Sequence, residues 1–192
     1  MTTYLRASEI IKKPVVTLGG EDVAQVKDIL FDATKGRIRG FTLTGRGLLS
    51  GPLHRELLWR NVHRLGPDAV MVRTGNALED DDTTAQTAEE EPGGGNVLGV
   101  AMTTRSGTRL GTITDAIIET GTTPVVAGYE LESPEHGSVL VPVAGPVTVS
   151  SERVLVPDET AEHSAGTLES FGTAAEGLRR RLEQDEQGEQ ED

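Results

Sequence analysis

Arginine is the residue type best placed to do chemistry in this sequence, and it is concentrated in the first third of the chain. Arg37 and Arg39 lie two positions apart in a segment expected to be a strand, so both side chains project from one face. Guanidinium groups gathered on one surface favour phosphate, RNA or an acidic protein, whereas scattered ones are ordinary solvated surface. Leucines of the glycine-rich loop that follows would add apolar contacts. The predicted partner-binding residues are Arg37, Arg39, Arg46, Leu48, Leu49, Leu53, Arg55, Arg60 and Arg64.

Groups that could catalyse a reaction or hold a metal are not brought together by the sequence. Asp28 and Asp115 occupy equivalent places in predicted strands, where a hydrogen bond within a turn or bulge is the expected role. The four histidines lack metal-ligand spacing, and the absence of cysteine excludes disulfides and thiolate sites. The acids at 79–82 are consecutive rather than alternating as in a calcium loop. We therefore predict no enzyme, no cofactor and no metal site.

The elements that would position these residues occur twice. Segment 16–32 returns as 103–119 at a constant offset of 87, so that Asp28 corresponds to Asp115. A repeat of this length is a whole small domain, because solenoid repeats are roughly 20–50 residues long. The sequence therefore predicts two copies of one fold.

Short apolar strands separated by glycine turns dominate both copies. Along 23–30 the apolar face changes sides near Asp28, which predicts a bulge. Gly19-Gly20 predicts a two-residue hairpin turn, and Ser106-Gly107 takes its place in the second copy. Such a pattern is typical of a small antiparallel barrel.

The next strands of the two copies align at an offset of 88 instead of 87, which implies one inserted residue in the turn before them. Gly40 corresponds to Gly128, and Leu57-Leu58-Trp59 is aligned with Leu140-Val141-Pro142. Each copy then closes with a short apolar strand.

Charge divides the chain further. The net charge is −13, yet residues 1–74 hold twelve Lys and Arg against seven Asp and Glu, while 75–96 hold seven acids and no base. Acidic, glycine-rich sequence buries too little apolar area to fold, so 75–96 is predicted to be a disordered linker.

The acidic tail, 158–192, contains a helical pattern over 167–186. Gly172 and Gly177 each cost about 1 kcal/mol in a helix, so the tail either frays or docks on a barrel or a partner. The apolar residues spaced 3, 4, 3 and 4 apart are Leu168, Phe171, Ala175, Leu178 and Leu182.

Both copies resemble the PRC-barrel domain, a small SH3-like β-barrel. The resemblance lies in the apolar strand and glycine turn, the run ending in Asp28 or Asp115, and the Gly-Phe or Gly-Tyr pair that follows. It implies an all-β chain of two tandem barrels, 1–74 and 97–157. Members of the family include the barrel of the photosynthetic reaction-centre H subunit and that of a ribosome-maturation factor. In both settings the barrel is a docking module.

The resemblance therefore implies a non-catalytic adaptor that docks on a protein complex. The alternatives are an RNA- or ribosome-associated factor that binds through the basic first barrel, and peripheral association with a photosystem. No signal peptide or membrane span is visible, so we expect a cytoplasmic protein. The two barrels are expected to pack as a pseudo-dimer or to form a homo-oligomer.

Overall fold

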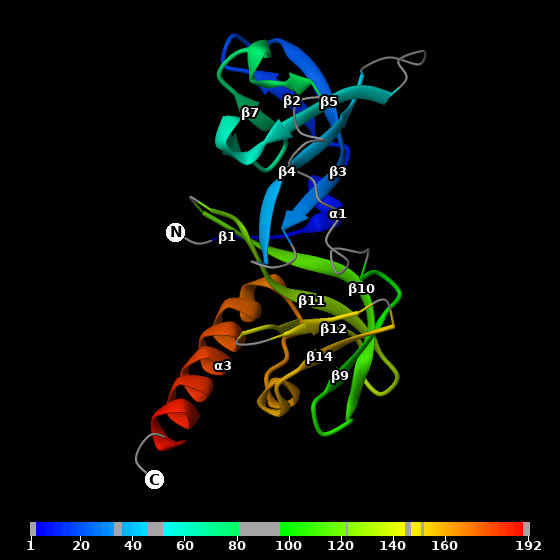
Figure 1. Cartoon of the computed structure of the whole chain (residues 1–192), viewed down its shortest axis with the longest axis vertical. Coiled ribbons are helices and arrows are strands. Elements are labelled where there is room, and N and C mark those ends of the chain that lie inside the picture. The colour runs from blue at the N-terminus through cyan, green and yellow to red at the C-terminus, as the bar shows by residue number, and fades with distance from the viewer. Residues whose placement is uncertain are drawn as a thin grey trace. The chain divides into compact units, whose positions relative to one another are not determined.

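The computed structural model describes residues 3–32, 36–45, 52–80, 97–121, 123–144, 147–150 and 152–189, which are mostly strand (Figure 1). The all-β prediction is confirmed. The chain divides into two compact units. The N-terminal unit is Ala7–Gly94 with Thr120–Val125, and the C-terminal unit is Met1–Arg6 with Gly95–Glu119 and Val126–Asp192.

The N-terminal unit is an antiparallel meander from β2 to β5, closed by β7, which pairs in parallel with β2. Alternating apolar residues of these strands, among them Val15, Val26, Leu43 and Val70, form its core. Its elements are α1 (Ala7–Ile10), β2 (Pro14–Thr17), β3 (Asp22–Asp32), β4 (Arg37–Thr44), β5 (Pro52–Leu58), η1 (Trp59–Asn61), β6 (Val62–Leu65), β7 (Val70–Val72), η2 (Gly75–Ala77) and β8 (Glu79–Asp80).

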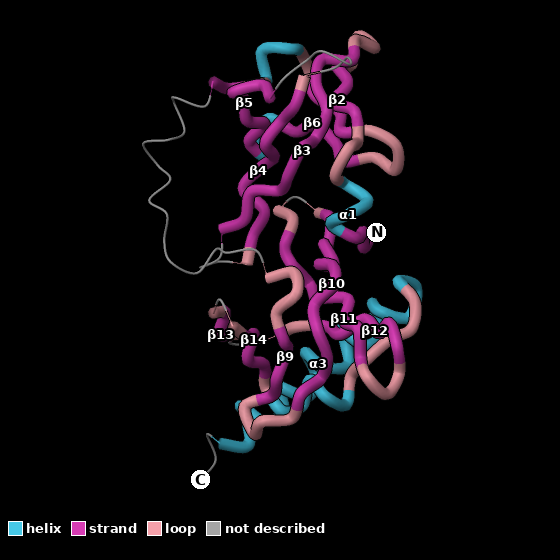
Figure 2. Tube along the Cα trace, turned by 90° about the vertical axis from the view of Figure 1, so that its right-hand side faces the viewer, coloured by secondary structure: helices cyan, strands magenta, loops and turns pink. Residues whose placement is uncertain are grey.

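The C-terminal unit repeats this plan. Its first hairpin strand, β9, pairs in parallel with the late strand β14, just as β2 pairs with β7. One long helix, α3, joins it, and Figure 2 shows how little else of the described chain is helical. Its elements are β1 (Thr3–Arg6), β9 (Ala101–Thr104), β10 (Arg109–Thr120), β11 (Val125–Ser133), β12 (Gly137–Pro142), β13 (Thr148–Val149), β14 (Arg153–Val156), η3 (Asp158–Glu162) and α3 (Leu168–Glu189).

The first hairpin turn has the same hydrogen bonds in both units. The amides of Gly20 and Gly107 donate to the carbonyls of Thr17 and Thr104, and both glycines have positive φ, 84° and 97°. The loop is therefore three residues long and ends in a left-handed glycine, so the predicted two-residue turn was one residue too short. Only the second glycine of Gly19-Gly20 needs to be glycine for its backbone angles.

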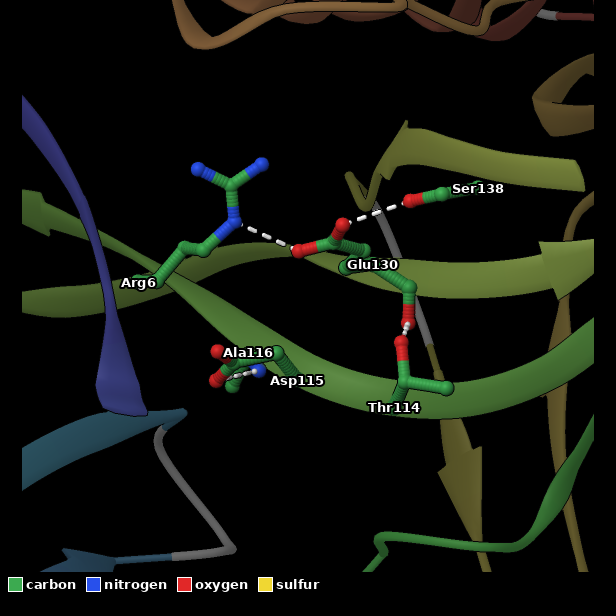
Figure 3. Close-up of polar contacts among 6 residues, drawn as sticks. All are labelled: Arg6, Thr114, Asp115, Ala116, Glu130 and Ser138. Atoms are coloured by element: carbon green, nitrogen blue, oxygen red, sulfur yellow. Dashed lines mark hydrogen bonds and ion pairs between the residues drawn. The ribbon is translucent and has the colours of Figure 1, made fainter. Parts of the chain in front are cut away.

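The bulge predicted near Asp28 is confirmed. Lys27 is skipped in the pairing of β3 with β4, and the Asp28 Oδ1 atom accepts the amide of Ile29 at 2.7 Å. Asp115 repeats the contact with the amide of Ala116 at 2.8 Å (Figure 3). Both aspartates therefore bond to the backbone of their own strand, as the sequence predicted.

The predicted alignment of the third strands was wrong by one residue. Leu58 lies opposite Gly40 in the first unit, and Pro142 lies opposite Gly128 in the second. Pro142 therefore corresponds to Leu58, and by the same register Leu140 corresponds to Glu56. The sequence could not fix this register because both segments are apolar over several consecutive positions.

The tail forms a helix that docks, which decides between the two alternatives left by the sequence. Its seam is buried at Phe171, Ala175 and Leu178, where α3 packs on β12 (Figure 1). The two glycines that lower the helix propensity of α3 each allow an aromatic side chain to lie close to the helix backbone. A Cβ at Gly172 would lie 3.2 Å from Cε2 of Tyr4, and one at Gly177 would lie 3.3 Å from the His163 ring.

The units also differ from the predicted domains, 1–74 and 97–157, at their edges. Residues 3–6 form β1, which pairs with β10 in the C-terminal unit. The predicted linker 75–96 begins too early, because Leu78 is buried and β8 pairs with β5. Residues 81–96 lie outside the described residues.

Candidate protein-interaction surface

Strand β4 carries the two arginines at the centre of the predicted surface. Arg37 is exposed, lies opposite Asp32, and also pairs with Val125 within the N-terminal unit. Arg39 is a bulge residue, because Leu30 lies opposite Gly40 while Phe31 lies opposite Ile38.

The bulge at Arg39 determines where its side chain points. Ile38 and Phe41 are both buried although they are three positions apart, so the extra residue has switched the strand's alternation. Arg39 therefore lies on the outer side of the sheet with Thr42, and not with Phe41 in the core.

An ion pair stands on this outer face. Arg39 Nη2 lies 3.8 Å from Glu56 Oε2, and the exposed fractions of the two side chains are 35% and 10%. Thr42 lies directly opposite Glu56 across β4 and β5. We call these three residues the Arg39–Glu56 cluster.

The cluster is incompletely hydrogen-bonded. Arg39 Nε, Thr42 Oγ1 and Glu56 Oε2 are all shielded from solvent and have no hydrogen-bond partner among the described residues. A buried polar atom without a partner costs about 1–3 kcal/mol, so three in one place are a substantial cost. Because the three atoms are covered in the free chain, another molecule can supply the remaining hydrogen bonds once the side chains that cover them move aside.

The same positions of the C-terminal unit are apolar. Ala127 corresponds to Arg39 and Leu140 to Glu56, and both are buried in a cluster with Phe171 and Ala175 of α3. Helix α3 thus covers this face in one unit, whereas the other unit has an ion pair there.

Of the other predicted residues whose side chains are described, Arg55, Arg60 and Arg64 do not join the cluster as one patch. Arg55 neighbours Glu56 on β5, so its side chain points to the opposite face, and its backbone pairs with Asp80. Arg60 is exposed on η1, which packs against β4. Arg64 is exposed on β6, separated from β4 in the sheet by β3, β2 and β7.

The side chains of the remaining four predicted residues are not among those that the structure describes. Arg46, Leu48 and Leu49 lie outside the described residues, and of Leu53 only the backbone, in β5, is described. Whether any of the nine residues contacts a partner stays a prediction.

Sequence reasoning missed Glu56 and Thr42. The signal for Glu56 was a charged residue at a position where the second copy has Leu140, an apolar one. The one-residue misalignment placed Leu57 there instead and hid the difference. Thr42 gave no signal, since threonine is common in strands.

In the described parts of the chain, no group of three or more His, Asp or Glu side chains is arranged to hold a metal ion. No helix within the same ranges is both long and apolar enough to cross a membrane.

A protein-family model matches the first copy of the fold. Residues 2–79 match the PRC-barrel domain. The chain carries a PRC-barrel domain. The matched range ends at β8, in agreement with the pairing of β8 with β5. It also begins at β1, which the structure places in the other unit. A comparison with curated protein sequences finds no match.

The PRC-barrel match fits a non-catalytic interaction module in general terms. The C-terminal unit, which the match does not include, has the same turn, the same hydrogen bond from an aspartate to the next backbone amide, and the same parallel closure. Its structure is consistent with a second barrel of the same kind.

Proposed function

We propose that the protein is a non-catalytic docking module of a cytoplasmic protein complex, and that the partner binds the outer face of β4 and β5 in the N-terminal unit. The observation that carries this proposal is the Arg39–Glu56 cluster, with its three shielded polar atoms that lack partners among the described residues. The PRC-barrel match supports the general role, and the cluster supplies the location.

The unpartnered atoms of the cluster indicate which hydrogen-bonding groups the partner must supply. Arg39 Nε needs an acceptor, and Glu56 Oε2 needs a donor. A protein segment supplies both from its backbone or from paired polar side chains, whereas a phosphate group offers acceptors alone. The cluster therefore favours a protein over RNA held through its phosphates alone, although the basic residues around it would steer either towards the unit.

The C-terminal unit shows which substitutions the fold should tolerate. Arg39→Ala together with Glu56→Leu gives the N-terminal unit the residues that stand at 127 and 140. This double variant removes the ion pair and its unpartnered atoms without changing the net charge. Arg73→Ala is a matched control, since Arg73 is exposed and lies beyond β7.

The test is affinity capture from cells with the full chain as bait, followed by identification of protein and RNA. We expect one defined set of proteins, retained at moderate salt, bound by the wild type and by Arg73→Ala and lost with the double variant. Equal capture by the double variant would refute the assigned face. Capture of RNA that falls steeply with salt would favour the nucleic-acid alternative instead, because counterion release makes such binding salt-dependent.

A further inference from the structure

The first strand and the last helix of the chain meet within the C-terminal unit. Strand β1 pairs with β10, and α3 packs against β1. The Tyr4 ring meets the Phe171 ring edge to face, with 5.0 Å between centroids, and lies over Gly172. We call the surface formed by β10, Glu130 and this part of α3 the β1 seat.

A charge pair completes the β1 seat. Arg6 Nε donates to Glu130 Oε2 at 2.5 Å, and Ser138 Oγ donates to the other carboxylate oxygen at 2.5 Å (Figure 3). The hydrogen bond from Arg6 is the main cause that lowers the pKa of Glu130, although partial burial acts to raise it. The seat therefore selects an aromatic ring and, two positions later, a cation.

By sequence, the strand that fills the seat belongs to the other unit. Ala7 follows Arg6 directly and already belongs to α1 of the N-terminal unit. The PRC-barrel match likewise includes β1 with residues 7–79. The repeat offset of 87 places the counterpart of Thr3–Arg6 at 90–93, which reads Glu-Glu-Pro-Gly and lacks strand-forming residues. Among the described residues, one such strand thus serves two copies of the fold.

Strand β1 is short and only partly buried. The strand has four residues, Thr3 is exposed, and the other three are only half-buried. Short terminal elements open at low free-energy cost. A strand that has left its own seat can make identical contacts in the seat of another copy, which is the basis of domain swapping.

We propose that the β1 seat binds the Thr3–Arg6 strand of a second copy of this chain, giving a dimer in which each copy supplies β1 to the other. This inference goes beyond the proposed function and does not depend on it, because the Arg39–Glu56 cluster takes no part.

The test is charge reversal in two separate full-length chains. Arg6→Glu brings two carboxylates together in the seat, and Glu130→Arg brings two guanidinium groups together, so each variant alone has like charges there. In a mixed dimer with exchanged strands, the new carboxylate of the first chain meets the new guanidinium of the second. The unchanged Arg6 of the second chain meets the unchanged Glu130 of the first, so both seats again hold opposite charges. Light scattering after gel filtration measures the mass.

We expect a 1:1 complex of twice the monomer mass from the mixed variants, and none from either variant alone. Co-expression of the two tagged chains covers the case in which either variant alone does not fold. The double variant Arg6→Glu/Glu130→Arg restores the pair within one chain and should behave as the wild type in mass and dimer fraction. Mixed chains that remain separate after co-expression would overturn the proposal and leave β1 as a strand that binds only its own chain.

Discussion

The outer faces of two corresponding hairpins, β4–β5 and β11–β12, have the same backbone and different side chains. Gly40 and Gly128 stand at the same place in each, and a Cβ there would lie 2.3 Å and 2.4 Å from the carbonyl oxygens of Leu57 and Val141. One face continues as Ala127 and Leu140 under α3, and the other as an incompletely bonded ion pair. One copy covers this face with its own helix, while the other keeps polar groups there, which is where we propose that a partner binds.

The comparison predicts first that α3 is structurally essential to its unit alone. Phe171→Ala removes a fully buried ring and should destabilise the C-terminal unit by about 3–5 kcal/mol. Urea unfolding followed by helix circular dichroism reports that unit, while fluorescence of Trp59, the single tryptophan, reports the other. Thr173→Ala, at an exposed position of α3, is the control. An equal shift in the Trp59 transition would show that the units do not unfold separately.

A second prediction concerns the two glycines. Gly40→Ala and Gly128→Ala should each destabilise their own unit by about 1–3 kcal/mol or more, because the new Cβ strikes the neighbouring strand. The effect at Gly128 should be larger, since its Cβ would also lie 2.7 Å from Cζ of Phe171. Separate unfolding of the two units by the same probes measures both. Equal effects would mean that the Phe171 ring of α3 can shift away from a Cβ at position 128 at little cost in stability.

Some of this arrangement was accessible from the sequence because it is local. The bulge at Asp28 follows from a switch of apolar face, and the seam of α3 from regular spacing. What was missed depends on distant contacts. Nothing near Thr3–Arg6 shows that it pairs with β10, and the value of Gly172 is visible only when Tyr4 lies above it.

A third prediction tests the unpartnered atoms directly. Arg39→Ala/Glu56→Leu should leave the N-terminal unit as stable as the wild type, or more stable by about 1 kcal/mol, because an incompletely bonded, partly exposed ion pair is replaced by apolar side chains. Trp59 fluorescence during urea unfolding measures this. A marked loss of stability would mean that the polar groups of the cluster stabilise the fold itself, which would contradict their role in binding a partner.

The smallest expected effect is a pH dependence confined to the C-terminal unit. Since the Arg6 hydrogen bond lowers the pKa of Glu130 from its usual value of about 4.5, ionised Glu130 stabilises the unit above that pH. This contribution should be lost as the pH falls from about 4.5 through the lowered pKa. Thermal melting followed by helix circular dichroism should show it, and Glu130→Gln should flatten the curve in this range. An unchanged slope in Glu130→Gln would assign the acid sensitivity to other carboxylates.

Hydrogen exchange on the full chain, alone and bound to the captured partner, shows which face the partner covers. We expect slower exchange in the described parts of β4 and β5, 37–44 and 52–58, with no change in β11 and β12, where α3 already covers the face. Protection confined to residues 97–189 would contradict it, because the partner would then bind the copy whose face is already covered.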